Sequence, residues 1–401
     1  MAKRIVIVVL CSAFSLLSPR TYGQTQHGPN ATRFEGFGAG VTGGVGRRAV
    51  TVRNLNDSGA GSLRAALGGN RIIRFSIAGT IKLGSPLVFD APNVTLDGFS
   101  APSPGITLTG SRGDCIDIWA PAHNIVVQGI RVRNCGNDNI QIAQRAHDVV
   151  IDHCSTSGAS DGNIDITESV YNVTLSWNIN ANITGGSGGT LVKYDAHQIS
   201  IHHSIYFNNQ GNGRNPLVTG GGDYPGSGPT RDLGVIADVR YNIVSGWGKF
   251  GTYFETDGVT KTYGNIVSNF YNGDPDHARN SIVLTQHGTS LTTAYIAGNA
   301  SIAKVAGCAY QYETCTNVTK INQMNNHAEY ATPAISGPGP TDNQGRLDTW
   351  KAVRNEAGLS MHYPDDMVDA GVRSGVAFPA LNIFSQPWNM DVGQGKAGRA
   401  N

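Results

Sequence analysis

A short strand-like segment recurs along the middle of this chain at nearly constant spacing. Five copies begin with an amide or a carboxylate and then alternate apolar and polar residues, at 93–97, 124–128, 148–152, 172–176 and 198–202. Their first residues are 31, 24, 24 and 26 positions apart. Period-two alternation is typical of strands, and the Gly, Asn, Ser and Asp residues between the copies are typical of turns. The chain therefore contains a repeated unit of short strands joined by turns.

A repeat of this length without helical segments favours a β-solenoid. A leucine-rich repeat would need a Leu-x-x-Leu-x-Leu skeleton, and a propeller would need blades of about 40 residues or more. The remaining architecture is a parallel β-helix, in which each coil stacks on the previous one and equivalent residues form ladders. We expect an apolar ladder and a second ladder at one corner, made respectively of Val94, Ile125, Val149, Val173 and Ile199, and of Cys154, Asn178 and Ser204.

The first residues have the pattern of a secretory signal peptide. Lys3 and Arg4 precede an apolar run at 5–17, and small residues follow at a plausible cleavage point. A membrane anchor is the alternative, but the run is short for a bilayer span. We expect residues 1–23 to be a signal peptide and the protein to be secreted, either outside the cell or into a periplasm.

The remainder is predicted to be a single domain over 24–401. The coils are expected at about 45–310 and a capping region at about 311–401, where 347–358 has a helical pattern. A solenoid with capped ends has no need to oligomerise, so we expect a monomer.

The balance of charged residues limits which classes of ligand the chain can bind. Its 401 residues carry 30 Lys and Arg and 29 Asp and Glu, with no basic block, which argues against a nucleic-acid binder. Any acidic ligand must therefore be held by a local site or a metal. Among the cysteines, Cys308 and Cys315 could close a small disulfide loop, whereas Cys115, Cys135 and Cys154 are interpreted as small buried apolar residues.

Several segments, in order, resemble the pectate lyase superfamily, polysaccharide lyase family 1. They lie at 54–66, 73–81, 149–154, 160–166 and 199–216, and the resemblance spans about 34–304. It implies an all-β fold, a single-stranded right-handed parallel β-helix with long loops on one face. It also implies a secreted, Ca²⁺-dependent enzyme that cleaves pectate (polygalacturonate) by β-elimination.

The resemblance also implies a set of site residues. Asp138, Asp161 and Asp165 correspond to an acidic cluster, and Ca²⁺ prefers six to eight oxygen ligands. The alternative is that these are three solvated turn acids. Arg214 matches the proton acceptor of the family, and its alternative is a surface Arg in a Gly- and Asn-rich loop.

Two basic residues of the family pattern are replaced. A second Arg is expected five residues after Arg214, where this chain has Thr219, and a substrate-binding Lys aligns with Gly188. Lys193 lies nearby and is predicted to replace that Lys. The acidic polysaccharide could therefore be pectate, a partly methylated pectin or a related uronan.

Other polar and aromatic residues have two interpretations. His202 and His203 could be a base or metal ligands, but we favour stacking within a ladder, with one ring inward and one outward. The neighbours Asp152 and His153 are expected to face opposite sides and to be structural. Trp247 and Tyr253 could stack against sugars or be buried.

Two other functions are compatible with a β-helix. A glycoside hydrolase of the polygalacturonase type would use Asp161 and Asp165 as acid and base. However, its Gly-His-Gly motif is absent, and the Asp-Asp pair at 365–366 lies outside the expected coils. A non-catalytic carbohydrate-binding β-helix is the second alternative. Metal dependence distinguishes a lyase from a hydrolase, and turnover distinguishes both from a binding protein.

Overall fold

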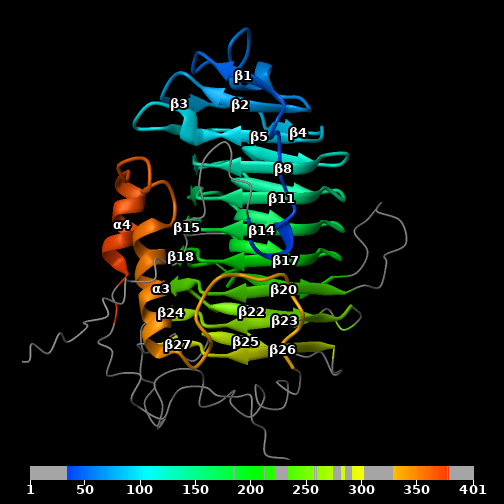
Figure 1. Cartoon of the computed structure of the whole chain (residues 1–401), viewed down its shortest axis with the longest axis vertical. Helices are drawn as coiled ribbons and strands as arrows, with labels where there is room; N and C mark the ends of the chain where they lie inside the picture. Colours follow the sequence, from blue (N-terminus) through cyan, green and yellow to red (C-terminus); the bar gives the residue numbers. More distant parts are fainter. Residues whose placement is uncertain are drawn as a thin grey trace, which may run out of the picture.

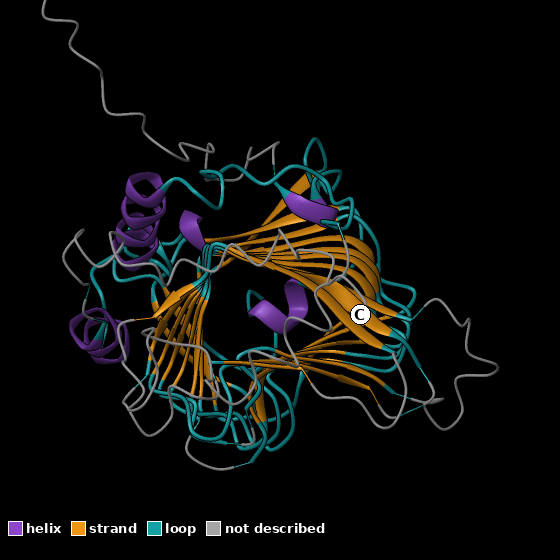
Figure 2. Ribbon diagram, turned by 90° about the horizontal axis from the view of Figure 1, so that it is seen from below, coloured by secondary structure: helices purple, strands orange, loops and turns teal. Residues whose placement is uncertain are grey.

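The chain winds into a parallel β-solenoid (Figure 1). The computed structural model describes residues 34–183, 186–211, 213–221, 234–256, 258, 260–273, 281–284, 291–301, 328–376 and 378. Within these residues, three sheets of ten, eight and nine strands surround one apolar core (Figure 2), and all their strand pairs are parallel. The predicted all-β parallel β-helix is confirmed.

Each full coil contributes one strand to each sheet. The ten-stranded sheet contains β1 (Arg48–Val52), β2 (Arg71–Phe75), β5 (Val94–Asp97), β8 (His123–Gln128), β11 (His147–Asp152), β14 (Tyr171–Ser176), β17 (His197–His202), β20 (Val235–Arg240), β23 (Thr262–Val267) and β26 (Thr292–Ala297). The eight-stranded sheet contains β4 (Leu87–Phe89), β7 (Ile116–Trp119), β10 (Ile140–Ala143), β13 (Gly162–Ile166), β16 (Gly188–Val192), β19 (Leu217–Gly220), β22 (Thr252–Thr256) and β25 (Ile282–Leu284). The nine-stranded sheet contains β3 (Gly79–Lys82), β6 (Ile106–Thr109), β9 (Ile130–Arg133), β12 (Ser155–Ser157), β15 (Ile179–Ala181), β18 (Ile205–Phe207), β21 (Ile243–Ser245), β24 (Phe270–Asn272) and β27 (Ala300–Ser301).

The register of the ten-stranded sheet reproduces the predicted apolar ladder. Val94 pairs with Ile125, and the ladder continues through Val149, Val173 and Ile199. All five side chains are buried in the core. The repeat seen in the sequence is therefore the length of one coil.

A polar ladder lines one corner of the solenoid, as predicted. The Cys154 amide donates to Asn178 Oδ1 at 2.8 Å, and the Asn178 amide donates to Ser204 Oγ at 3.0 Å. Asn242 and Asn269 extend the ladder by the same contact, since the Ser204 amide donates to Asn242 Oδ1 and the Asn242 amide to Asn269 Oδ1, both at 2.9 Å. The buried amides at this corner thus find acceptors on the next coil.

Two helices pack on the nine-stranded sheet, α3 (Asn343–Glu356) and α4 (Met367–Gly375) (Figure 1). The helical pattern at 347–358 corresponds to α3. Trp350 of α3 is buried against Phe270, and its indole N–H donates to the Ser268 carbonyl at 2.8 Å. The other helices among the described residues are short: η1 (Gly36–Gly38), α1 (Leu63–Ala66) and η2 (Gly98–Ser100). No helix in the described part of the chain is long and apolar enough to cross a membrane.

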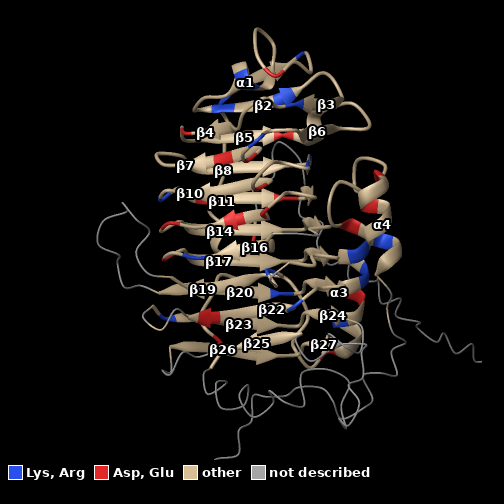
Figure 3. Cartoon of the chain, turned by 180° about the vertical axis from the view of Figure 1, so that it is seen from behind, with Lys and Arg blue, Asp and Glu red and all other residues tan. Residues whose placement is uncertain are grey.

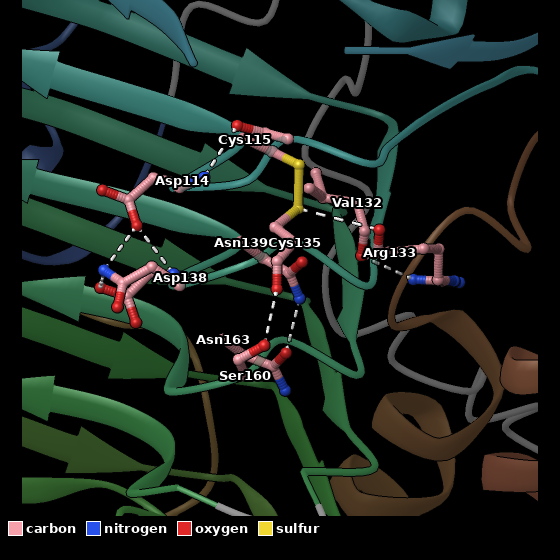
Figure 4. Close-up of a disulfide and its surroundings, with 12 residues drawn as sticks. Asp114, Cys115, Val132, Arg133, Cys135, Asp138, Asn139, Ser160 and Asn163 are labelled. Atoms are coloured by element: carbon pink, nitrogen blue, oxygen red, sulfur yellow. Dashed lines mark hydrogen bonds between the residues drawn. A yellow bond between two sulfur atoms is a disulfide. The ribbon is translucent and has the colours of Figure 1, made fainter. Parts of the chain in front are cut away.

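The cysteines differ from the sequence-based interpretation. Cys115 and Cys135 form a disulfide, with their Cα atoms 5.7 Å apart, rather than two separate buried thiols (Figure 4). Their separation of 20 residues is shorter than one coil, so the two residues are not ladder partners but lie on successive turns that stack at one corner. Cys154 is a free buried cysteine, as expected. Cys308, Cys315 and the predicted signal peptide lie outside the described residues.

Candidate active site

Three carboxylates from two successive coils meet near the amino-terminal ends of β10 and β13 in the eight-stranded sheet. One carboxylate oxygen from each of Asp138, Asp161 and Asp165 lies within 4.8 Å of the others. Asp138 is in the turn between β9 and β10, Asp161 immediately precedes β13, and Asp165 is in β13. Figure 3 shows that Lys, Arg, Asp and Glu residues also lie on several other strands, although most strand residues are uncharged. The predicted grouping of these three acids is present in the structure.

The turn that carries Asp138 is held by hydrogen bonds between successive coils. Asp114 Oδ1 accepts from the Asp138 amide at 2.7 Å and from the side chain of Asn137 at 2.8 Å (Figure 4). Asp138 Oδ1 in turn accepts from the Gly162 amide at 2.7 Å. Sequence reasoning missed Asp114, although its separation of 24 residues from Asp138 equals the coil repeat.

Burial and crowding make this cluster electrostatically unfavourable. Burial, with the charges of Asp165 and Asp114, raises the pKa of Asp138 to about 9. Burial raises the pKa of Asp165 to about 7, although Arg214 opposes that shift. Asp161 is more exposed, with 40% of its side-chain surface accessible. Such a group of hard oxygen donors gains from a cation that compensates its charge.

Arg214 completes the cluster from two coils further along the solenoid, in the turn that precedes β19. Its guanidinium Nη1 lies 2.9 Å from Asp165 Oδ2 and 3.8 Å from Asp161 Oδ2. Its carbonyl accepts from the Thr190 amide at 2.7 Å, which fixes the backbone against β16. Only 14% of the side chain is exposed. Arg214 is thus a partly buried residue of the acidic cluster and not a free surface Arg.

The two replaced basic positions have clear structural surroundings. Gly188 has φ +118, and a Cβ there would lie 3.2 Å from the Arg214 nitrogen and 3.3 Å from its Cβ. Thr219 is buried and donates its hydroxyl to the Gly220 carbonyl at 2.9 Å. Lys193 follows β16 two residues after Leu191, which pairs with Asp165, so strand alternation places it on the same outer face. Its ammonium lies 4.6 Å from the centroid of the Tyr194 ring.

The outer face of this sheet changes character along the solenoid axis. One register column runs through Asp117, Gln141, Asp165, Leu191, Leu217 and Tyr253. Burial and the neighbouring Asp114 raise the pKa of Asp117 to about 8. The column is therefore polar or acidic up to Asp165 and mainly apolar beyond it.

Asp152 and His153 form a pair, contrary to the sequence prediction. His153 has φ +47, and its Nδ1 lies 2.9 Å from Asp152 Oδ2. A left-handed corner residue interrupts the alternation of strand side chains, so neighbours can meet there. Asp152 also accepts from Ser176 Oγ at 2.6 Å. The pair therefore belongs to a buried polar column of the ten-stranded sheet and not to the acidic cluster.

Two coils further along, His202 and His203 repeat this geometry. His203 has φ +51 and stacks on Trp177 at 4.6 Å between centroids, which confirms the predicted stacking. The predicted inward and outward orientation is wrong, because both rings are buried and their Nδ1 atoms are 2.9 Å apart. Burial lowers the pKa of His202 to about 4 and that of His203 well below its usual value.

The two aromatic residues considered for sugar stacking, Trp247 and Tyr253, differ in their exposure. Trp247 is buried in the core and packs edge-to-face on Tyr271 at 6.0 Å, so it cannot stack against a sugar. Tyr253 is half-buried on the outer face of β22, and its hydroxyl donates to Glu255. Asp365 pairs with Arg373 at 2.6 Å, outside the coils. The residues that a hydrolase would require are therefore not supplied by that Asp-Asp segment.

Comparison with known proteins agrees with this geometry. No family model matches the chain. Residues of the chain are 30% identical over 271 positions to a protein from Aspergillus fumigatus named "Probable pectate lyase C", covering 66% of this chain and 58% of that protein. The chain thus spans little more than half the length of this relative.

Two solved structures share the fold. The cedar pollen allergen Jun a 1 superposes with a TM-score of 0.57 at 17% identity, covering 81% of this chain and 92% of the allergen. A pectate lyase from Bacillus sp. N165 in complex with trigalacturonate gives a TM-score of 0.55 at 15% identity, covering 82% of this chain and 99% of that one. At these identities the likeness concerns the β-helix itself.

Proposed function

We propose that this chain, a homologue of the pectate lyases with their parallel β-helix fold, is a calcium-dependent lyase that cleaves pectate or a related uronan by β-elimination. The observation that carries the proposal is Arg214 at 2.9 Å from Asp165, within a cluster of three carboxylates. The name of the fungal relative and the trigalacturonate bound by the Bacillus neighbour support an acidic polysaccharide as substrate.

Asp138, Asp161 and Asp165 would hold the Ca²⁺ ion. Their donor set fits, because all three supply carboxylate oxygens within 4.8 Å of one another and leave further positions for water and substrate. The raised pKa values of Asp138 and Asp165 support the assignment, since they reflect buried negative charge without sufficient compensation.

The chemistry follows from the charge of the substrate. When bound, Ca²⁺ would supply positive charge that acidifies the C5 proton next to the sugar carboxylate. Arg214 accepts the C5 proton, the C–H electrons form the C4–C5 double bond, and the C4–O bond breaks. The leaving oxygen takes a proton from water. Asp165 holds Arg214 in position for this transfer.

The apolar residues that follow Asp165 in the outer register column indicate which substrates the site accepts. Leu191 and Leu217 follow Asp165 in register, and Thr219 stands where a second Arg is usual. Leu191, Leu217 and Tyr253 offer no positive charge for uronate carboxylates, and the described cations near this part of the column are Lys193 and Lys249, whose ammonium lies 5.0 Å from the centroid of the Phe250 ring that packs on Tyr253. We propose that the enzyme tolerates partial methyl esterification there.

We also propose that the protein is secreted and monomeric. The Cys115–Cys135 disulfide supports an oxidising compartment, because such bonds are rare in the cytosol. The signal-peptide pattern at 1–23 supports the same location.

The test is the absorbance of the unsaturated product when purified protein meets polygalacturonate or methylated pectin, with Ca²⁺ or with a chelator. We expect a Ca²⁺-dependent signal that falls at least about 100-fold in Arg214→Lys and in Asp161→Asn, as expected for a positioned acid–base group or metal ligand. Arg48→Lys, at an exposed position of β1, is the matched control and should retain the signal.

The alternatives give different results. Reducing ends without unsaturated product would identify a hydrolase. Binding of the polysaccharide without either product would identify a carbohydrate-binding protein. A product signal unaffected by the chelator would contradict the metal part of the proposal.

A further inference from the structure

A second group of potential metal ligands lies on the ten-stranded sheet, on a different face from the acidic cluster. It includes Glu35, which lies in the amino-terminal segment that crosses the outer surface of this sheet (Figure 1). The Phe37 amide donates to Ser200 Oγ at 3.0 Å, and Thr174 Oγ1 donates to the Glu35 carbonyl at 2.8 Å. A Cβ at Gly36 would lie only 2.4 Å from Ser200 Oγ. The backbone at Glu35 is therefore tightly fixed over β14 and β17.

His202 and His203 lie below this segment with their ring nitrogens facing each other. Their Nδ1 atoms are 2.9 Å apart, and the rings are nearly perpendicular, at 87°. One of these nitrogens donates a hydrogen bond to the lone pair of the other, and a metal ion would take the place of that shared proton, with both rings then protonated at Nε2. The His203 ring is held between Trp177 and Tyr241, at 4.6 and 5.1 Å.

We propose that Glu35, His202 and His203 form a binding site for a borderline transition-metal ion of the Zn²⁺ class. One ligand atom from each residue lies within 4.8 Å of the other two. Bonds of about 2.0–2.2 Å from Zn²⁺ to imidazole nitrogen and carboxylate oxygen place such atoms about 3–3.5 Å apart in a tetrahedral site, so small side-chain rotations suffice. Two nitrogens and one oxygen leave a fourth position for water.

The chemistry of the donors separates this site from the acidic cluster. Imidazole suits Zn²⁺, Cu²⁺ and Ni²⁺, whereas an all-carboxylate group suits Ca²⁺ and Mg²⁺. The Glu35 carboxylate already accepts from the Ser336 amide at 3.1 Å and from its hydroxyl, yet a carboxylate has lone pairs for a further ligand. The two sites could thus be occupied independently.

The surrounding charges are compatible with a cation. Arg240, which pairs with His202 in register on the adjacent β20, is itself paired with Asp238 at 2.7 Å and with Glu329 at 2.8 Å, and its remaining charge contributes to the lowered pKa of both histidines. Asp152 is in the same register column as His202, two coils earlier, and its negative charge favours a positive charge at His202. No other charge faces the histidines among the described neighbours apart from the His153 ring.

A metal here would connect residues 167 positions apart in the sequence and fasten the amino-terminal segment to the coils. Because the ion would bind only the folded arrangement, its binding would stabilise the protein in proportion to the logarithm of its concentration. The site is therefore proposed as a structural clamp, independent of the lyase proposal.

The test is titration of the purified full chain with Zn²⁺, in excess Ca²⁺ so that carboxylate sites are filled. We expect one Zn²⁺ per chain by calorimetry, a melting temperature that rises with Zn²⁺, and visible absorption from four-coordinate Co²⁺ as a substitute. Glu35→Gln preserves the contact with Ser336 and should weaken Zn²⁺ binding at least tenfold, as should His203→Gln.

His147→Gln is the matched control, because His147 belongs to a half-exposed stack with His123 and Tyr171 elsewhere on the same sheet. Circular dichroism verifies that each variant is folded, and Glu35→Gln carries the test if His203→Gln is not. The proposal is overturned if wild-type protein binds no Zn²⁺ stoichiometrically. It is equally overturned if Glu35→Gln binds like wild type, or if His147→Gln alone removes the binding.

Discussion

The Cys115–Cys135 disulfide should be a major local source of stability. We consider the double variant Cys115→Ala/Cys135→Ala, which removes the bond without leaving an unpaired thiol. The closed loop has a sequence separation of 20 residues. Restricting a loop of that length in the unfolded chain is worth about 3 kcal/mol at 25 °C in the chain-entropy treatment. We therefore expect the free energy of unfolding to fall by about that amount.

The assay is urea-induced unfolding followed by circular dichroism, after mass spectrometry has established the disulfide in the wild-type protein. Cys154→Ala is the matched control, since Cys154 is buried and free and should cost only about 1 kcal/mol. Reduction of the wild-type protein should reproduce the double variant. A loss below about 1 kcal/mol in the double variant would refute the reasoning and would mean that the stacked turns already restrict this loop.

Three further perturbations test the ladders, the buried charge and the helical cover. Asn242→Ala removes the acceptor of the buried Ser204 amide and should reduce the free energy of unfolding by about 1–3 kcal/mol, measured by urea unfolding. Burial raises the pKa of Asp97, so the charged carboxylate destabilises the folded state at high pH and this destabilisation disappears as the pH falls. Asp97→Asn removes the charge. The variant should therefore exceed the wild type in free energy of unfolding by more at pH 7 than at pH 4, measured by urea unfolding. Trp350→Ala should cost about 3–5 kcal/mol in thermal or urea unfolding, because the indole is fully buried between α3 and Phe270.

The parts of the structure that depend on the coil repeat could be predicted from sequence. A constant step of about 24 residues determines which residues stack, so the ladder from Val94 to Ile199 followed directly from counting. Asp138 and Asp161 came together for the same reason, since they lie nearly one coil apart. Asp114 was within reach of the same argument, because it precedes Asp138 by one full coil.

The errors arose at the corners. His153 and His203 have positive φ, so the two-residue alternation that holds within strands fails exactly one residue beyond the strand end. The signal in the sequence lay one coil earlier, because Gly129 is equivalent to His153 in register and also has positive φ. The disulfide was not predicted because Cys115 and Cys135 are 20 residues apart and so are not equivalent positions on successive coils.

The geometry of the acidic cluster depends on glycines as much as on acids. Gly162 and Gly188 are paired in register on β13 and β16. A Cβ at Gly162 would lie 2.4 Å from Asp165 Oδ1, and one at Gly188 would crowd the backbone of Arg214. Arg214 reaches back across β16 to Asp165 because neither position has a side chain. A Lys at 188, where the related pattern has one, could not enter this arrangement without displacing Arg214. The glycine at 188 is therefore what allows Arg214 to pair closely with Asp165. Any basic contact to substrate beyond the cluster must come from another residue of the outer face, such as Lys193.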